Sequence, residues 1–73
     1  MGKLRVLSGR EVCRILERHG FTEVRRRGSQ VVMQRRDVSG TVTVPVSDYA
    51  ELRIGTLLSI IRQSGVSRGE FEE

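Results

Sequence analysis

The sequence predicts a small α+β domain in which a helix, a three-stranded antiparallel sheet and a second helix follow one another, with both helices on one face of the sheet. Two observations predict this class. Apolar residues at helical spacing occur towards both ends of the chain, and three valine-containing segments separated by turn-forming residues lie between them. The 73 residues form one domain, residues 1–73, whose core is too thin to enclose a cofactor, so we expect none.

The first helix is expected at residues 8–19. Ser8 and Glu11 have the spacing of a capping box, in which the serine hydroxyl accepts from an early backbone N–H and the glutamate reaches back to the start of the helix. The positions that follow at helical spacing are Val12, Ile15, Leu16 and His19. Gly20 is a typical residue for the C-terminal end of such a helix.

Three strands are expected from the segments TEVRRR, QVVMQR and TVTVPV, residues 22–27, 30–35 and 41–46. Val24 is the apolar residue expected to hold the first strand to the core. Gly28 and Ser29 form a hairpin turn, and the segment RDVSG supplies turn-forming residues for the second connection. Pro45 cannot donate a hydrogen bond to a sheet, so it marks an edge or the end of the third strand.

Side chains alternate between the two faces of a strand, which divides the residues of the middle strand into two sets. We place Val31 and Met33 in the core. This leaves Gln30 on the face that stays open to solvent, together with Val32 and Gln34.

The second helix follows the loop SDYAELRIG and is expected to bury an apolar stripe. The stripe consists of Ile54, Leu57, Leu58 and Ile61, widened by Ile60. Gly65 ends the helix. Ser67 and Glu70 repeat the capping-box spacing and open a last short turn that could dock Phe71 on the core.

The charge of the chain favours nucleic acid as a partner. The formal net charge is +4, the sequence pI is about 10.6, and Lys3 is the only lysine in a basic set dominated by arginine. Guanidinium groups match phosphate geometry better than ammonium groups do. The densest basic segments are residues 25–27 and 35–36. They are open to two interpretations: a charged sheet edge that prevents aggregation, or a patch that binds phosphates and releases counterions.

Other kinds of site find little support in the sequence. His19 is the only histidine; it ends a helix, where the dipole favours a cation, and no cluster of other ligands surrounds it, so we expect no metal site. Asp48 and Glu51 have no partner that would make them a catalytic pair, and no serine has a nearby His–Asp arrangement. Cys13 is the only cysteine, so it forms no intramolecular disulfide and is expected to be buried or half-buried.

No segment has the pattern of a signal peptide or approaches the ~20 apolar residues of a membrane span. A cytoplasmic protein without membrane contact is therefore expected.

Four blocks of the sequence resemble the HicA toxin family of bacterial and archaeal toxin–antitoxin pairs. They are SGREVCRILERHGF, RRRGSQ, TVTVPV and ELRIGTLLSIIRQSGVSRGEF, and they cover nearly the whole chain in order with matching spacing. The resemblance implies a double-stranded-RNA-binding-like fold and a ribosome-independent endoribonuclease that cleaves mRNA and arrests growth. It also implies a HicB-type antitoxin as partner, which covers the active site and often binds operator DNA. An oligomer formed with the antitoxin is compatible with this expectation.

The chain departs from the family at one position. The resemblance implies a catalytic histidine directly after the Gly-Ser pair, but this sequence has Gln30 there. An imidazole with a pKa near ~6.5 can accept or donate a proton at neutral pH, whereas an amide can only form hydrogen bonds. We therefore predict that RNA cleavage is impaired or absent, and we do not expect His19 to replace the missing group.

The predicted RNA-binding residues surround Gln30 in the sequence. They are Gly28, Ser29, Arg25, Arg26, Arg27 and Arg35. Gly28 is expected to let the backbone approach RNA, and Ser29 to donate a hydrogen bond to a phosphate. Two alternatives remain open: a non-catalytic RNA-binding module, and a protein-binding domain whose basic face docks an acidic partner.

Overall fold

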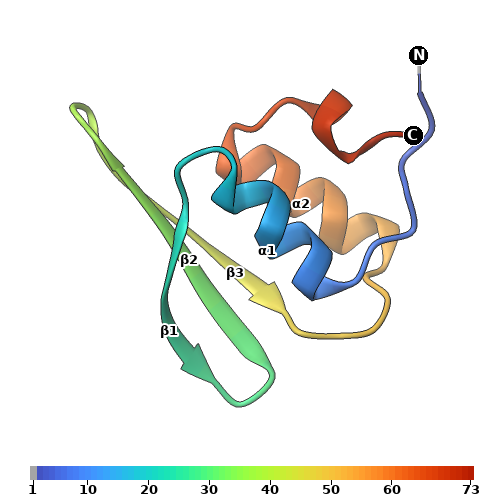
Figure 1. Cartoon of the computed structure of the whole chain (residues 1–73), viewed down its shortest axis with the longest axis horizontal. Helices are drawn as coiled ribbons and strands as arrows, with labels where there is room; N and C mark the ends of the chain where they lie inside the picture. The colour runs from blue at the N-terminus through green and yellow to red at the C-terminus, as the bar shows by residue number, and fades with distance from the viewer. Residues whose placement is uncertain (1) are drawn as a thin grey trace.

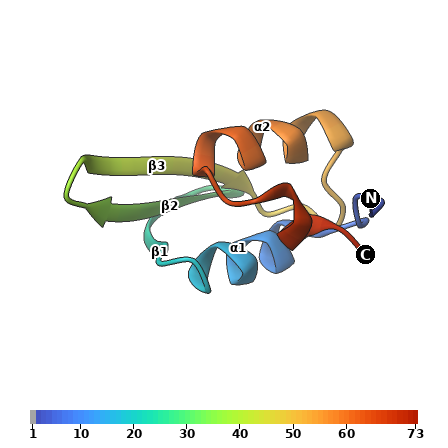
Figure 2. The same ribbon diagram turned by 90° about the horizontal axis from the view of Figure 1, so that it is seen from above.

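The computed structural model describes residues 2–73 and has the expected order of elements (Figure 1). Two helices, three strands and a short 3-10 helix follow the chain as α1 (Gly9–Glu17), β1 (Thr22–Arg27), β2 (Gln30–Asp37), β3 (Gly40–Ser47), α2 (Ile54–Ser64) and η1 (Arg68–Phe71). The strands form one antiparallel sheet in the order β1-β2-β3. Figures 1 and 2 together show α1 beside β1 and α2 beside β3, both on the same side of the sheet, which confirms the predicted fold class.

The core lies between the sheet and the two helices. Val31 and Met33 of β2 are 3% and 0% exposed, as the alternation of the strand predicts. They pack with apolar side chains of the neighbouring elements, which include Val44 and Val46 of β3, Val12, Ile15 and Leu16 of α1, and Leu57 and Ile60 of α2. Within residues 2–73, no helix is long and apolar enough to cross a membrane.

The capping box at the start of α1 is present. The N–H of Ser8 donates to Oε1 of Glu11 at 2.9 Å, and the N–H of Glu11 donates to Oγ of Ser8 at 3.1 Å. The helix ends at Glu17, two residues before the predicted end at His19. The reason is the turn at Gly20, where φ is +91°, a left-handed conformation that cannot continue a helix and that redirects the chain into β1.

The first strand is not anchored to the core by Val24, contrary to the prediction from the sequence. Val24 was expected to hold β1 to the core, but it is 47% exposed. The register of β1 on β2 shifts between Glu23 and Arg25, so Val24 is the extra residue of an irregularity that takes its side chain out of the alternation. Every residue of β1 is exposed. The strand is therefore attached mainly by its pairing with β2.

The buried face of α2 is also rotated relative to the predicted stripe. Leu57, Ile60 and Ser64 are buried, whereas Ile54 and Leu58 are 63% and 37% exposed. Ser64 can be buried because its hydroxyl donates to the carbonyl of Ile61 at 3.2 Å and accepts from the N–H of Val66 at 3.2 Å. A hydroxyl satisfied by its own helix end is not visible as an apolar position in the sequence.

The predicted second capping box forms only in part. The hydroxyl of Ser67 accepts from the N–H of Gly69 at 3.3 Å, while the carboxylate of Glu70 lies 3.2 Å from Nε2 of His19 instead of reaching back to Ser67. This contact joins η1 to the end of α1. Phe71 is 0% exposed, so the last turn docks on the core as expected.

A close contact between α1 and the end of β3 depends on a glycine. A Cβ added to Gly9 would collide with the carbonyl oxygen of Ser47. The N–H of Gly9 also donates to the carbonyl of Tyr49 at 2.9 Å. The absence of a side chain therefore lets the first turn of α1 pack directly on the β3–α2 connection.

We predict that Gly9→Ala lowers the free energy of unfolding by about 1–3 kcal/mol, because the backbone of α1 or β3 must move to admit the methyl group. The measurement is urea denaturation followed by circular dichroism. The matched control is Gly55→Ala, where a Cβ would meet nothing within 4 Å and stability should stay level or rise slightly. Equal stability of the two variants would contradict the proposed close packing.

Candidate functional site

The sheet face turned away from the helices is built of cross-strand rows. In the antiparallel register, Arg27 pairs with Gln30 and Gln30 pairs with Ser47, so these three side chains form one row on the same face. The next row along the sheet consists of Arg25, Val32 and Pro45. Gln30 is exposed and lies on this face, as the alternation of β2 predicts.

Two further rows extend the same face towards the β2–β3 hairpin. Gln34 lies between Thr22 and Thr43, and its Nε2 donates to Oγ1 of Thr43 at 3.2 Å. Arg36 pairs with Thr41 in the last row. We call this surface the open face; its residues are Thr22, Arg25, Arg27, Gln30, Val32, Gln34, Arg36, Thr41, Thr43, Pro45 and Ser47. Within residues 2–73, no ion pair engages its three guanidinium groups.

The tight turn before Gln30 fixes which face that side chain takes. Gly28 has φ +58° while Ser29 has a negative φ, the pattern of a type II′ hairpin turn with glycine first. A Cβ on Gly28 would meet nothing within 4 Å, so its conformation and not a lack of space calls for glycine. The carbonyl of Ser29 accepts from the N–H of Asp48 at 2.6 Å, which ties the turn to the β3–α2 connection.

Two of the predicted RNA-binding arginines lie on the other side of the sheet. Arg26 pairs with Val31, and its Nη1 donates to Oδ2 of Asp48 at 3.0 Å. The guanidinium of Arg35 lies 4.8 Å from the centre of the Phe21 ring, and its Nη1 is 3.4 Å from the carbonyl of His19. The stacking and hydrogen bond give Arg35 a structural role at the start of β1.

The open face therefore brings together only part of the predicted site. Gln30, Arg25 and Arg27 share it, and Gly28 and Ser29 form the turn at its end. Arg36, which was left out of the predicted site, lies on the same face near the hairpin end. The two-residue alternation of β2, which places Gln30, Val32 and Gln34 on this face, also places Arg36 there and could have predicted it.

Asp48 is a residue that sequence reasoning missed. Its backbone holds Ser29 after the turn glycine, and its carboxylate holds Arg26 before it. One residue thus fixes both sides of the hairpin that carries Gln30. The sequence did not reveal this role, because Asp48 meets the turn through the register of β3 on β2, in which Gln30 pairs with Ser47.

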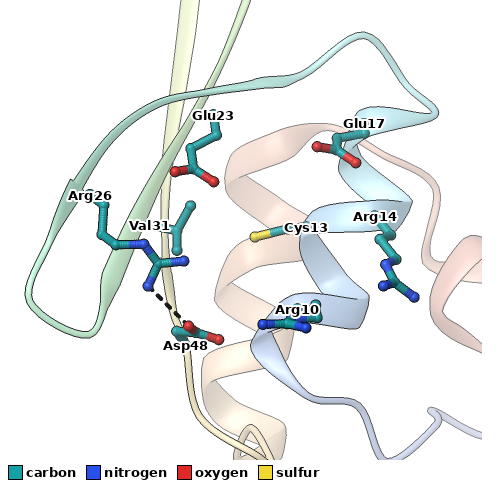
Figure 3. Close-up of a pocket in the computed structure, with 8 residues that line it drawn as sticks. All are labelled: Arg10, Cys13, Arg14, Glu17, Glu23, Arg26, Val31 and Asp48. Atoms are coloured by element: carbon teal, nitrogen blue, oxygen red, sulfur yellow. Dashed lines mark hydrogen bonds and ion pairs between the residues drawn. The ribbon is translucent and has the colours of Figure 1, made fainter.

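A groove lies between α1 and β1, on the side opposite the open face (Figure 3). It has a volume of about 260 Å³ and is lined by Arg10, Cys13, Arg14, Glu17, Glu23, Arg26, Val31 and Asp48. Figure 3 shows the Cys13 thiol near the middle of the groove, with the Arg26–Asp48 pair at one end and the carboxylates of Glu17 and Glu23 at the other. The charges of both signs make this a poorer surface for a polyanion than the open face.

The open face has no side chain that exchanges protons near neutral pH. Its rows contain arginine, glutamine, threonine, serine, valine and proline only. His19 lies at the other end of the helix layer, next to Glu70. In the part of the chain that the structure describes, no group of three or more His, Cys, Asp or Glu side chains could hold a metal ion. The arrangement suits binding of an extended anion better than acid–base chemistry.

A family model described as the HicA toxin of bacterial toxin–antitoxin systems matches residues 9–66. The match covers the chain from the first residue of α1 to just after α2, including the whole sheet. No curated protein matches the chain.

Cys13 is predicted to react slowly with alkylating reagents. Burial raises the pKa of its thiol from 9.0 to about 11, and the carboxylates of Glu17, Glu23 and Asp48 add to the effect. At pH 8 the fraction of reactive thiolate should therefore be about 100-fold lower in the folded chain than in the unfolded chain. The measurement compares the rate of iodoacetamide modification in buffer and in concentrated urea. Equal rates would show that the thiol is not protected in the groove.

Proposed function

The chain belongs to the HicA toxin family of bacterial toxin–antitoxin systems, and we propose from this premise that its open face binds RNA at a site whose cleavage chemistry is disabled by Gln30. As a family member it is the toxin of such a pair. The proposal concerns its substrate, the state of its catalytic position and its partner.

The substrate we propose is mRNA, held by its phosphates. Arg25, Arg27 and Arg36 are exposed on the open face without ion-pair partners among residues 2–73, so their guanidinium groups are available to phosphate oxygens. Such contacts release counterions from RNA, and affinity then falls steeply with salt. The glycine turn presents its backbone beside the same row, which suits close approach of a ribose-phosphate chain.

Cleavage of RNA by its own 2′-hydroxyl needs two proton transfers. A base removes the proton of the 2′-hydroxyl, the oxygen attacks the adjacent phosphorus, and the departing 5′-oxygen takes up a proton from an acid. The resemblance places a histidine for this work at position 30. The amide of Gln30 can hold a phosphate oxygen or a hydroxyl, but it can neither accept nor release a proton at neutral pH.

The single observation that carries the proposal is the composition of the row around Gln30. Its neighbours there are Arg27 and Ser47, and a guanidinium keeps its proton at any physiological pH. Arg27 can stabilise charge on a bound phosphate, but no neighbour in the row takes over general acid or base catalysis. The chain therefore binds its substrate and cleaves it slowly or not at all.

The partner we propose is an antitoxin of the HicB type, in keeping with the resemblance. It would cover the open face and exclude RNA from it. Because mRNA is the proposed substrate, we place the protein in the cytoplasm.

One alternative has a specific observation in its favour. The absence of any proton-exchanging group on the open face also fits an RNA-binding module that was never catalytic. The two readings differ in what a histidine at position 30 does. In the toxin it completes a site that is otherwise intact, whereas in a binding module it adds one more polar side chain.

We predict that Gln30→His restores RNA cleavage and causes growth arrest when the variant is expressed without an antitoxin. The expected gain in cleavage rate is about 10²–10⁴-fold, the usual contribution of one general acid or base. The measurement is the cleavage of a labelled RNA by purified protein, beside a growth curve.

The matched control is Gln34→His. Gln34 lies on the same face of the same strand, four residues further along, and the same substitution there should leave cleavage unchanged. If a folded Gln30→His protein binds RNA but cleaves no faster than the Gln34→His protein, the catalytic part of the proposal is wrong and the binding-module reading holds.

A further inference from the structure

A line of arginines runs along α1 on the side away from the core. Arg10, Arg14 and Arg18 follow one another at intervals of four residues, from the first turn of α1 to its C-terminal cap, and all three are exposed. Residues four apart lie on one side of a helix and are separated by about 6 Å along its axis. The buried residues Val12 and Leu16 lie on the opposite side.

The stability of the helix explains these arginines only in part, because the dipole favours a cation at Arg14 and Arg18 in the last turn and at the C-cap but not at Arg10 in the first turn. Like charges four residues apart repel each other and destabilise a helix. In residues 2–73, no ion pair or side-chain hydrogen bond engages Arg10, Arg14 or Arg18. Arg14 nevertheless lies close enough to Glu11 to lower the pKa of that carboxyl, so the charge of the line is only partly compensated.

A fourth arginine joins them from a different segment of the chain. Arg5 precedes α1 and lines a hollow of about 200 Å³ together with Arg14 and Arg18; Glu11 and Ile15 complete the lining. The carboxylate of Glu11 accepts the N–H of Ser8, and this hydrogen bond lowers the pKa of Glu11. Arg5 and Arg14 lower the same pKa to a smaller extent, so Glu11 offsets part of the positive charge of the three guanidinium groups that line the hollow. We call Arg5, Arg10, Arg14 and Arg18 the arginine ridge.

We propose that the arginine ridge is a second phosphate-binding surface, which holds RNA that continues beyond the segment bound on the open face. This rests on the proposed function. Arg25 and Arg27 lie on the open face of β1, and the RNA would pass around this edge to reach α1. Arg26, on the groove side, is paired with Asp48 and is not counted as a phosphate contact. Figure 3 shows Arg26 and Arg10 on facing sides of the groove, with Arg14 further out on α1.

The dimensions of the molecule allow one RNA to reach both surfaces. The domain measures 31 × 29 × 18 Å along its principal axes, so a single strand of several nucleotides can pass from the open face around the β1 edge to α1. The spacing of guanidinium groups along the ridge suits a chain of regularly repeated negative charges.

A protein surface is the weaker candidate for this ridge. Protein interfaces centre on exposed apolar side chains surrounded by polar ones. The large apolar side chains of α1 are Val12, Ile15 and Leu16, and all are buried. The ridge therefore has charge without the apolar centre that a protein partner would bury.

The test measures RNA affinity by fluorescence anisotropy, using the intact chain with Gln30 so that the RNA is not consumed. Two unstructured RNAs are used, of about four and about sixteen nucleotides, lengths that span the usual range of single-strand sites. Salt is varied from about 50 to about 200 mM, because the slope of log affinity against log salt counts the phosphates held.

The ridge variant is Arg14→Gln with Arg18→Gln, and the matched control is Arg53→Gln with Arg62→Gln on and beside α2, which removes the same charge. For the long RNA, the slope of log affinity against log salt should be shallower by about 1.4 in the ridge variant than in the control. Each phosphate contact on a single strand contributes ~0.7 to this slope, and the variant loses two contacts. If the ridge variant and the control bind equally at 1 M salt, where charge contacts are screened, this slope difference makes the ridge variant roughly 25-fold weaker than the control at 0.1 M salt. For the short RNA, it should match the control.

A ridge variant that binds the long RNA as tightly as the control overturns this inference. The inference is also overturned if such a variant keeps its RNA affinity but no longer assembles with the antitoxin, because the ridge would then bind protein. A second variant, Arg25→Gln with Arg27→Gln, removes two arginines of the open face. It distinguishes failure of the ridge proposal from failure of the proposed RNA site on the open face. If this open-face variant weakens binding of both RNAs while the ridge variant does not, the open face stands and the ridge is excluded. If it matches the control for both RNAs, the proposed RNA site itself is wrong.

Discussion

The alternation of side chains along β2 links the core of this domain to its candidate site. Val31 and Met33 must face the helices because they supply the middle of a thin core, and their burial turns Gln30, Val32 and Gln34 to the opposite face. A shift of one residue would exchange the two sets completely. The turn at Gly28 and the hold of Asp48 on Ser29 fix the register at the end of the strand where Gln30 lies. The position of Gln30 is therefore a consequence of core packing.

The same constraint divides the arginine run of β1 into two groups with different roles. Arg25 and Arg27 face solvent on the open face, while Arg26 is directed to the groove and pairs with Asp48. In the proposed site, a run of like charges on one strand would thus serve RNA binding and turn geometry together. Arg35 follows the same rule on β2 and stacks on Phe21. A basic side chain can contact RNA on the open face only if the alternation of its strand directs it to that face.

The order of elements, the sheet and the two faces of β2 could be predicted because they depend on local periodicity and turn residues. The failures have other causes. Val24 leaves the core because of an irregularity in pairing, Ser64 enters it because its own helix end satisfies the hydroxyl, and Glu70 turns to His19 across the fold. Val24 depends on an irregular backbone and Glu70 on a partner remote in sequence, whereas Ser64 is satisfied by nearby backbone groups that a hydrophobic pattern does not register. Asp48 was missed because its partners, Ser29 and Arg26, are remote from it in sequence.

The central claim is that the open face of the sheet, centred on the row of Gln30, is where RNA binds. The most direct measurement is an NMR titration of the ¹⁵N-labelled chain with an uncleaved RNA of about four nucleotides, the lower end of single-strand site sizes. The account predicts the largest amide shifts at Arg27, Gly28 and Gln30 and along the neighbouring rows, with the outer side of α2 unchanged. Shifts confined to the helices, with the Gly28 turn and the strands unaffected, would contradict it.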